Sequence, residues 1–186
     1  MQRLAAVAML AFLVAVAATG CGGGSDSACT TTTTDATQAW ATDFCSAVTT
    51  WKTDLDNTTS QFTDASNLSQ DNLRSAASDA RDSTQTLVDS LKSLGKPPTD
   101  SGQQVEDSIN TLSTTLDDES KKIEDTANGV SGITQLPGAI STVSSSLSAM
   151  ASAFSQTIQT IQDADVQGEL KTAFDDAPEC ADLTSS

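Results

Sequence analysis

Four cysteines carry most of the chemical reactivity that this sequence offers: Cys21, Cys29, Cys45 and Cys180. A thiol can be acylated or oxidised to a disulfide, and beside a base or further ligands it can act as a nucleophile or bind a metal. The chain contains no histidine, which removes the commonest general base near neutral pH and the commonest metal ligand. There is also no Cys-x-x-Cys pair, Gly-rich phosphate loop or nucleophile elbow. We therefore predict that the protein is not an enzyme and uses no metal or cofactor.

The first cysteine closes an apolar stretch. Arg3 gives a short positive start, Leu4 to Ala18 is an unbroken apolar run, and the small residues Thr19 and Gly20 precede Cys21. This is the layout of a secretory signal peptide. The run is shorter than the roughly 20 apolar residues that a transmembrane helix requires.

The residues Ala18-Thr19-Gly20-Cys21 resemble the lipobox of bacterial lipoproteins, although leucine is commoner than alanine at the first position. The resemblance implies that residues 1–20 are removed and that Cys21 is lipidated. The alternative is an ordinary signal peptide cut nearby, with Cys21 left as a spare thiol. Two or three acyl chains hold a protein stably on a membrane that it does not span. We therefore expect the protein on the extracytoplasmic face of the cell membrane.

The chain is strongly acidic, with a net charge of −16. Residues 1–20 contain one arginine and no acid, so their removal makes the charge one unit more negative. Such a surface is repelled by nucleic acid and by anionic lipid. The expected partners are the membrane, through the anchor, and an envelope protein.

Beyond the signal peptide, residues 21–34 form a Gly/Ser/Thr tether and residues 35–183 a helical domain. We predict a first helix from Asp35 to Ala65, a second from an N-cap at Ser69 to Gly95, and a third from a Ser101/Gln104 capping box to Gly129. The fourth begins between Thr134 and Pro137, and a short fifth follows Gly168. Apolar residues recur at steps of three and four. In the first helix they are Trp40, Phe44, Val48, Trp51, Leu55 and Phe62; in the fourth they are Ile140, Val143, Leu147, Met150, Phe154, Ile158 and Ile161.

These patterns predict an all-α fold: an up-down-up-down four-helix bundle with a short fifth C-terminal helix. The same periods would also suit a coiled-coil oligomer, but short turns containing Gly and Pro favour antiparallel neighbours within one chain. Trp40 and Trp51 lie in an apolar stripe at helical spacing. We interpret them as core residues rather than as ligand-stacking residues.

The lipobox, the tether, the sequence Trp40-Ala41-Thr42-Asp43-Phe44-Cys45 and a lone cysteine near the C-terminus together resemble small actinobacterial cell-surface lipoproteins. Those proteins are largely of unknown function. The resemblance therefore implies a lipid-anchored protein at the cell surface with a helical bundle, and it identifies no catalytic residues in this chain.

Glu119 falls in a predicted core position, where a carboxylate is costly unless it is paired. One interpretation is a polar pocket in which Ala77 and Ala80 leave room and Arg81 or Arg74 reaches the carboxylate. The other is that Glu119 lies at the edge of the stripe and reaches water. The acidic clusters lack the turning loop that calcium requires, so we predict no metal site in them.

Acylation of Cys21 would leave an odd number of cysteines, in a compartment that permits disulfides. Cys45 lies near the start of the first helix, and the fourth helix of such a bundle finishes at the same end. The segment from Asp165 to Pro178 is long enough to bring Cys180 back. We predict a Cys45–Cys180 disulfide and a free or intermolecular Cys29; three unpaired thiols or a pairing with Cys29 are the alternatives.

These observations favour a non-enzymatic, membrane-anchored envelope lipoprotein that acts as a binding or scaffold module. The alternative is an extracytoplasmic sensor of a small ligand or signal, with a pocket between helices. A filled core would favour the scaffold, and a hollow near Glu119 and Ala77 would favour the sensor.

Overall fold

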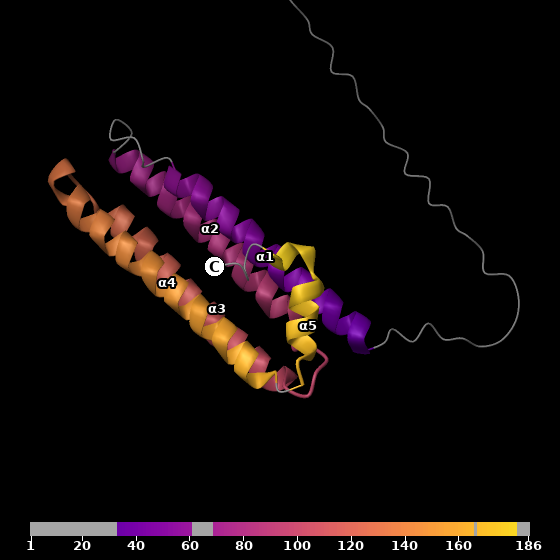
Figure 1. Cartoon of the computed structure of the whole chain (residues 1–186). Helices are drawn as coiled ribbons and strands as arrows, with labels where there is room; N and C mark the ends of the chain where they lie inside the picture. The colour runs from indigo at the N-terminus through magenta and orange to yellow at the C-terminus, as the bar shows by residue number, and fades with distance from the viewer. Residues whose placement is uncertain (1–32, 61–68, 166, 182–186) are drawn as a thin grey trace, which may run out of the picture. The chain divides into compact units, whose positions relative to one another are not determined.

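The computed structural model describes residues 33–60, 69–165 and 167–181. All of these fall within the unit Thr31–Ser186. The predictions made for the signal peptide, for Cys21 and Cys29, and for Phe62 lie outside the described residues. Every regular element within the described ranges is a helix (Figure 1), which confirms the predicted all-α class.

The long helices are α1 (Thr33–Ser60), α2 (Gln70–Leu94), α3 (Gly102–Gly129) and α4 (Leu136–Ala164). A short helix, α5 (Glu169–Asp176), follows, and single 3₁₀ turns lie at η2 (Ile133–Gln135) and η3 (Pro178–Cys180). These bounds agree with the predicted order of elements. Pro137 occupies the first turn of α4, where its missing N–H costs no intrahelical hydrogen bond.

The predicted start of α2 is confirmed, because the Ser69 hydroxyl accepts a hydrogen bond from the Asn72 N–H at 3.2 Å. Gly95 ends the helix with a φ of 62°, a conformation that glycine adopts without strain. The predicted capping box of α3 is wrong. Ser101 makes no side-chain cap, and its hydroxyl instead lies 3.3 Å from that of Thr99. The Ser101 hydroxyl therefore contacts the preceding turn and makes no hydrogen bond to the first N–H groups of α3.

Neighbouring helices in the sequence also pack together: α1 on α2, α2 on α3 and α3 on α4, while α5 and η3 lie on α1 (Figure 1). The Trp40 indole near the start of α1 donates to the Gly95 carbonyl beyond the end of α2, at 3.1 Å. Arg74 near the start of α2 donates to the Val130 carbonyl at the end of α3, at 2.6 Å. These two bonds fix the registers of α1 on α2 and of α2 on α3.

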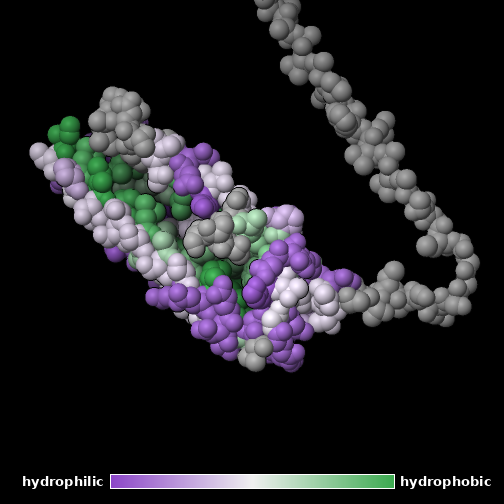
Figure 2. Space-filling model, in the orientation of Figure 1, coloured by the Kyte–Doolittle hydropathy of each residue, from purple (hydrophilic) through white to green (hydrophobic). Residues whose placement is uncertain are grey.

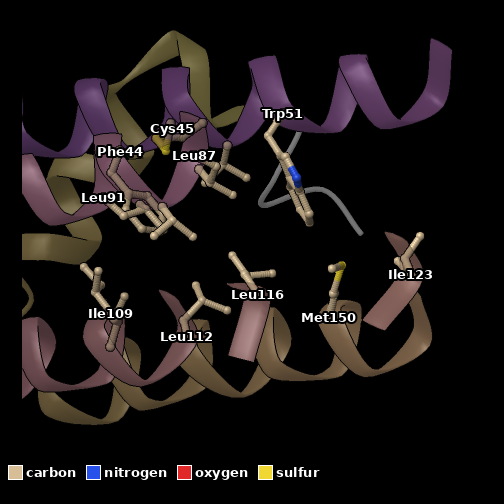
Figure 3. Close-up of a cluster of buried hydrophobic side chains, with 14 of the residues drawn as sticks. Phe44, Cys45, Trp51, Leu87, Leu91, Ile109, Leu112, Leu116, Ile123 and Met150 are labelled. Atoms are coloured by element: carbon tan, nitrogen blue, oxygen red, sulfur yellow. A yellow bond between two sulfur atoms is a disulfide. The ribbon is translucent and has the colours of Figure 1, made fainter. Parts of the chain in front are cut away.

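The core is built from large aliphatic side chains and the aromatic residues of α1. Figure 3 shows side chains from α1 and α2 facing side chains from α3 and α4 across it. The largest fully buried residues include Phe44, Leu87, Leu91, Ile109, Leu112, Leu116 and Met150. Trp40 and Trp51 both belong to this core, which confirms their interpretation as core residues.

The predicted apolar stripe of α4 faces the core at every position but one. Met150 and Ile161 are buried, Val143, Leu147, Phe154 and Ile158 are half-buried and pack against the core, and Ile140 is 41% exposed. Small side chains of α4 are buried as well, Ala139, Ser146 and Thr157 among them, and α3 is the helix on which α4 mainly packs. Small residues at a helix contact allow close packing. Consequently α4 packs mainly on α3, and several of its core-facing apolar residues also border a hollow beside α1.

Candidate binding groove

The predicted disulfide between Cys45 and Cys180 is present, with the two Cα atoms 5.1 Å apart and a sequence separation of 135. Both side chains are buried. The Thr49 hydroxyl one turn further along α1 donates to the Glu179 carbonyl at 3.3 Å. The C-terminal segment is therefore fixed to α1 by a covalent bond and by polar contacts.

An aromatic cluster holds α5 on the same helix. Trp40 and Phe44 stack with their ring centroids 5.5 Å apart, and Phe174 of α5 meets both rings edge-on at 6.2 and 5.8 Å. Such pairs add to the free energy of apolar burial. Gln38 also donates to the Ala173 carbonyl at 3.3 Å, and Leu170 is fully buried. Thus α5 covers part of α1 that faces the end of α4.

A groove runs between α1 and α4. Its first part has a volume of about 520 Å³, and most of its wall is apolar: Val48, Trp51 and Leu55 from α1 with Leu147, Met150, Phe154 and Ile158 from α4. Figure 3 shows Trp51 and Met150 directed toward one another from the two helices. Hydrophobic residues line a hollow along α4 in Figure 2. We call this lining the α1–α4 seam.

The second part of the groove lies beneath α5 and has a volume of about 540 Å³. Phe44 and Cys45 of α1, Ile158 and Ile161 of α4, and Leu170 and Phe174 of α5 line it. Ile158 belongs to both parts, so they succeed one another along α4. The span from Leu147 to Asp165 corresponds to about 27 Å of helix.

The seam is nearly free of charge on its α4 side. No charged residue occurs from Thr126 to Gln162, although the chain as a whole is strongly acidic. Lys52 and Asp56 form the α1 rim, and Lys52 makes no ion pair within the described part of the chain. The sequence prediction assigned the stripe of α4 to the core, where most of it lies, but did not foresee that a groove opens beside the stripe. The long uncharged stretch was the signal that could have revealed it.

The charged contacts lie instead between α2 and α3. Arg81 pairs with Glu124 at 3.0 Å and with Asp117 at 3.5 Å, and it donates to the Ser120 hydroxyl at 3.2 Å. The predicted pocket residue Glu119 is partly exposed and pairs with Lys122 at 3.4 Å, one turn along the same helix. Neither Arg81 nor Arg74 supplies its partner, whereas Ala77 and Ala80 are buried as expected. The pocket at Glu119, Ala77 and Ala80 stays a prediction.

Lys171 on α5 pairs with Asp175, which raises the pKa of the lysine through their hydrogen bond and charge attraction. Across residues 33–60, 69–165 and 167–181, no group of three acidic, cysteine or histidine side chains is arranged to hold a metal ion. None of the helices in those ranges is long and apolar enough to cross a bilayer.

Comparison of the chain with protein-family models, with curated proteins and with solved structures gives no match. The groove is the feature that combines an apolar wall, an accessible opening and a volume large enough to receive another group.

Proposed function

We propose that this chain is a non-enzymatic, lipid-anchored envelope protein whose helical domain is a scaffold or binding module on the extracytoplasmic face of the membrane. The observation that carries the proposal is the apolar run Leu4 to Ala18 followed by Gly20-Cys21, the pattern of a lipoprotein signal peptide. The disulfide between Cys45 and Cys180 supports export, because such bonds persist in oxidising compartments.

In this proposal the four long helices form an up-down-up-down bundle, and α5 packs on its first helix, α1. The hydrogen bonds from Trp40 to Gly95 and from Arg74 to Val130 support opposite directions for successive helices. Short connections between α2, α3 and α4 support the same arrangement. The bundle closes less tightly between α1 and α4, where the seam offers a surface for binding.

A scaffold role agrees with the side chains available. The sequence has no histidine, the commonest general base near neutral pH, and Cys45 and Cys180 are joined in a disulfide, so neither offers a thiol nucleophile. The seam, by contrast, presents large apolar residues at an opening, a composition that marks interaction sites. Binding through shape and apolar burial is therefore the activity that these residues support best.

The decisive experiment concerns the anchor. The substitution Cys21→Ala should release the protein from the membrane fraction or leave the precursor uncut, and it should abolish metabolic labelling with palmitate. Cys29→Ala is the matched control and should leave processing, labelling and membrane association unchanged. An unchanged membrane fraction with normal processing of the Cys21→Ala variant would refute lipid anchoring.

A sensor of a small ligand is the second candidate. The hollow of about 540 Å³ beneath α5 favours it, because pockets for small molecules have such volumes and apolar walls. Filling this hollow with Ile158→Trp should abolish binding of the fluorescent dye ANS if the hollow is an accessible pocket. Equal dye binding by the parent and the variant would argue against the sensor.

A further inference from the structure

We infer that the groove between α1 and α4 is a binding site for one unbranched hydrocarbon chain, of the kind that a fatty acid or a phospholipid carries. The inference rests on the binding role proposed for the domain and deepens it by naming the class of ligand. It does not involve the lipid anchor, so a failure of the Cys21→Ala test leaves it intact.

The long helices do not close the bundle evenly. Helix α1 packs on α2 and α5, and α4 packs on α3, but α1 and α4 do not pack closely on each other. The space between them forms the two parts of the groove, of about 520 and 540 Å³. Both volumes are typical of pockets for small molecules. A helix of a partner protein, about 10–12 Å across with its side chains, needs more room.

The two parts of the groove form one elongated hollow. Ile158 lines both parts, so they meet at this residue, and Figure 2 shows the hydrophobic lining along α4. The hollow follows about 27 Å of helix, whereas one acyl chain spans about 15 Å, half of the hydrocarbon core of a bilayer. A flexible chain fits this length and can bend past Ile158. A compact, rigid ligand would fill only one of the two parts.

Polar groups are scarce along the wall of the first part. Trp51 lines it from α1, and Met150 and Phe154 line it from α4. Its two hydroxyls, those of Thr59 and Ser155, already donate to carbonyls of their own helices. A ligand with polar groups along its length would give up hydrogen bonds to water without replacing them. A hydrocarbon chain has no such bonds to lose.

Charged side chains border the openings of the groove. Lys52 and Asp56 lie beside the first part, and Lys171 and Asp175 lie beside the second. Each opening therefore presents a cation and an anion to a polar head group that stays in water. An apolar wall with charged side chains at its openings suits an amphiphile, whose chain enters the groove while its head remains outside.

Titration of the full chain with n-alkylphosphocholines tests the inference. Cys21→Ala removes any covalent lipid that would compete, and Trp40→Phe leaves Trp51 on the wall of the groove as the only tryptophan. Octyl-, decyl-, dodecyl- and tetradecylphosphocholine are added below the concentrations at which they form micelles. We expect a change in Trp51 fluorescence that saturates at one chain per protein. Two further buried methylenes should lower the Kd by about tenfold until the groove is filled.

Ile158→Phe is the decisive variant, because a larger side chain where the two parts meet should stop a chain from passing between them. The gain in affinity should then end at a shorter chain than in the parent. Ile140→Phe is the matched control, since it makes the same change on the same helix at a residue that is 41% exposed and lines neither part. It should leave the whole series unchanged. Circular dichroism establishes that each variant is folded, and calorimetry of the chain with both tryptophans gives the Kd without Trp40→Phe.

A Kd that does not depend on chain length would overturn the inference, as would the uptake of many chains without saturation. An Ile158→Phe series that gains affinity up to the same chain length as the parent would also overturn it. Binding of ANS beneath α5 without any dependence on chain length would support the sensor of a small ligand and exclude a hydrocarbon chain. Palmitate and palmitoyl-lysophosphatidylcholine share one chain, so their relative affinities distinguish a fatty acid from a phospholipid as its source.

Discussion

Trp51 on α1 donates its indole N–H to the hydroxyl of Thr84 on α2, at 3.0 Å, in the buried core of the domain. Thr84 in turn donates to the Ala80 carbonyl at 2.7 Å. The Thr84 hydroxyl therefore accepts a hydrogen bond from the indole of Trp51, which lines the seam, and donates a second hydrogen bond within α2. This pair couples the wall of the groove to the α1–α2 interface.

Thr84→Val should lower the stability of the domain by about 1–3 kcal/mol, because valine keeps the shape of threonine but leaves the indole N–H of Trp51 buried and unpaired. Equilibrium unfolding in urea measures the change. Thr86→Val, at an exposed position two residues further on, should change stability by less than about 0.5 kcal/mol. Equal effects for the two substitutions would contradict a specific role for the Trp51–Thr84 bond.

Removal of the disulfide by the double substitution Cys45→Ala and Cys180→Ala should lower stability by about 2–5 kcal/mol, because the bond closes a very long loop in the unfolded chain. Denaturant unfolding under non-reducing conditions gives the magnitude. Cys29→Ala should have no effect. Non-reducing peptide mapping of the exported protein offers an independent check, and a peptide joining Cys29 to Cys45 or Cys180 would rule the pairing out.

Leu116→Ala should cost about 2–5 kcal/mol, since the side chain is fully buried and its loss leaves a cavity. Ile133→Ala, at a site 76% exposed, should change the free energy of unfolding by less than about 0.5 kcal/mol. Thermal and urea denaturation of both variants provide the comparison. A small effect at Leu116 would mean that this face of α3 is open to solvent.

Substitution of Ser113 or of Ser120 by alanine should change the stability of the domain in opposite directions. Both are buried, but the Ser113 hydroxyl has no hydrogen-bond partner among the described residues, whereas that of Ser120 accepts from Arg81 and donates to the Asp117 carbonyl. Ser113→Ala should therefore raise stability, by up to about 1–3 kcal/mol, as it removes an unsatisfied group. Ser120→Ala should lower stability. Unfolding curves that shift in the same direction for both would refute this distinction.

The sequence predicted the helices and the disulfide because these depend on local signals and on chain length. Helix α2 begins after Ser69 and ends before Gly95, as expected for a serine N-cap and a glycine C-cap. The position of Cys45 near the start of α1 brought it within reach of Cys180. The groove beside the α4 stripe was not predictable in the same way. The spacing of Ile140, Leu147 and Phe154 shows only that they share a face, and which helix covers that face depends on the packing of the whole domain.

Polar partners were harder to predict than apolar faces. Glu119 pairs with Lys122 in its own helix, and Arg81 reaches Asp117 and Glu124 instead. Long charged side chains can reach several neighbours, so register and rotamer decide among them. The Ser101 hydroxyl lies 3.3 Å from that of Thr99 in the preceding turn and makes no side-chain cap of α3.

The bond between Cys45 and Cys180 also determines how the domain would respond to mechanical load. A pull applied between the N-terminal and C-terminal ends of the chain enters α1 at Thr33, crosses the sulfur–sulfur link and leaves through Ala181. The chain between the two cysteines, which includes α2, α3 and α4, lies outside this path and bears no tension. Only the first turns of α1 can be drawn out, so most of the seam would keep its shape under a load that would extend a chain without the crosslink.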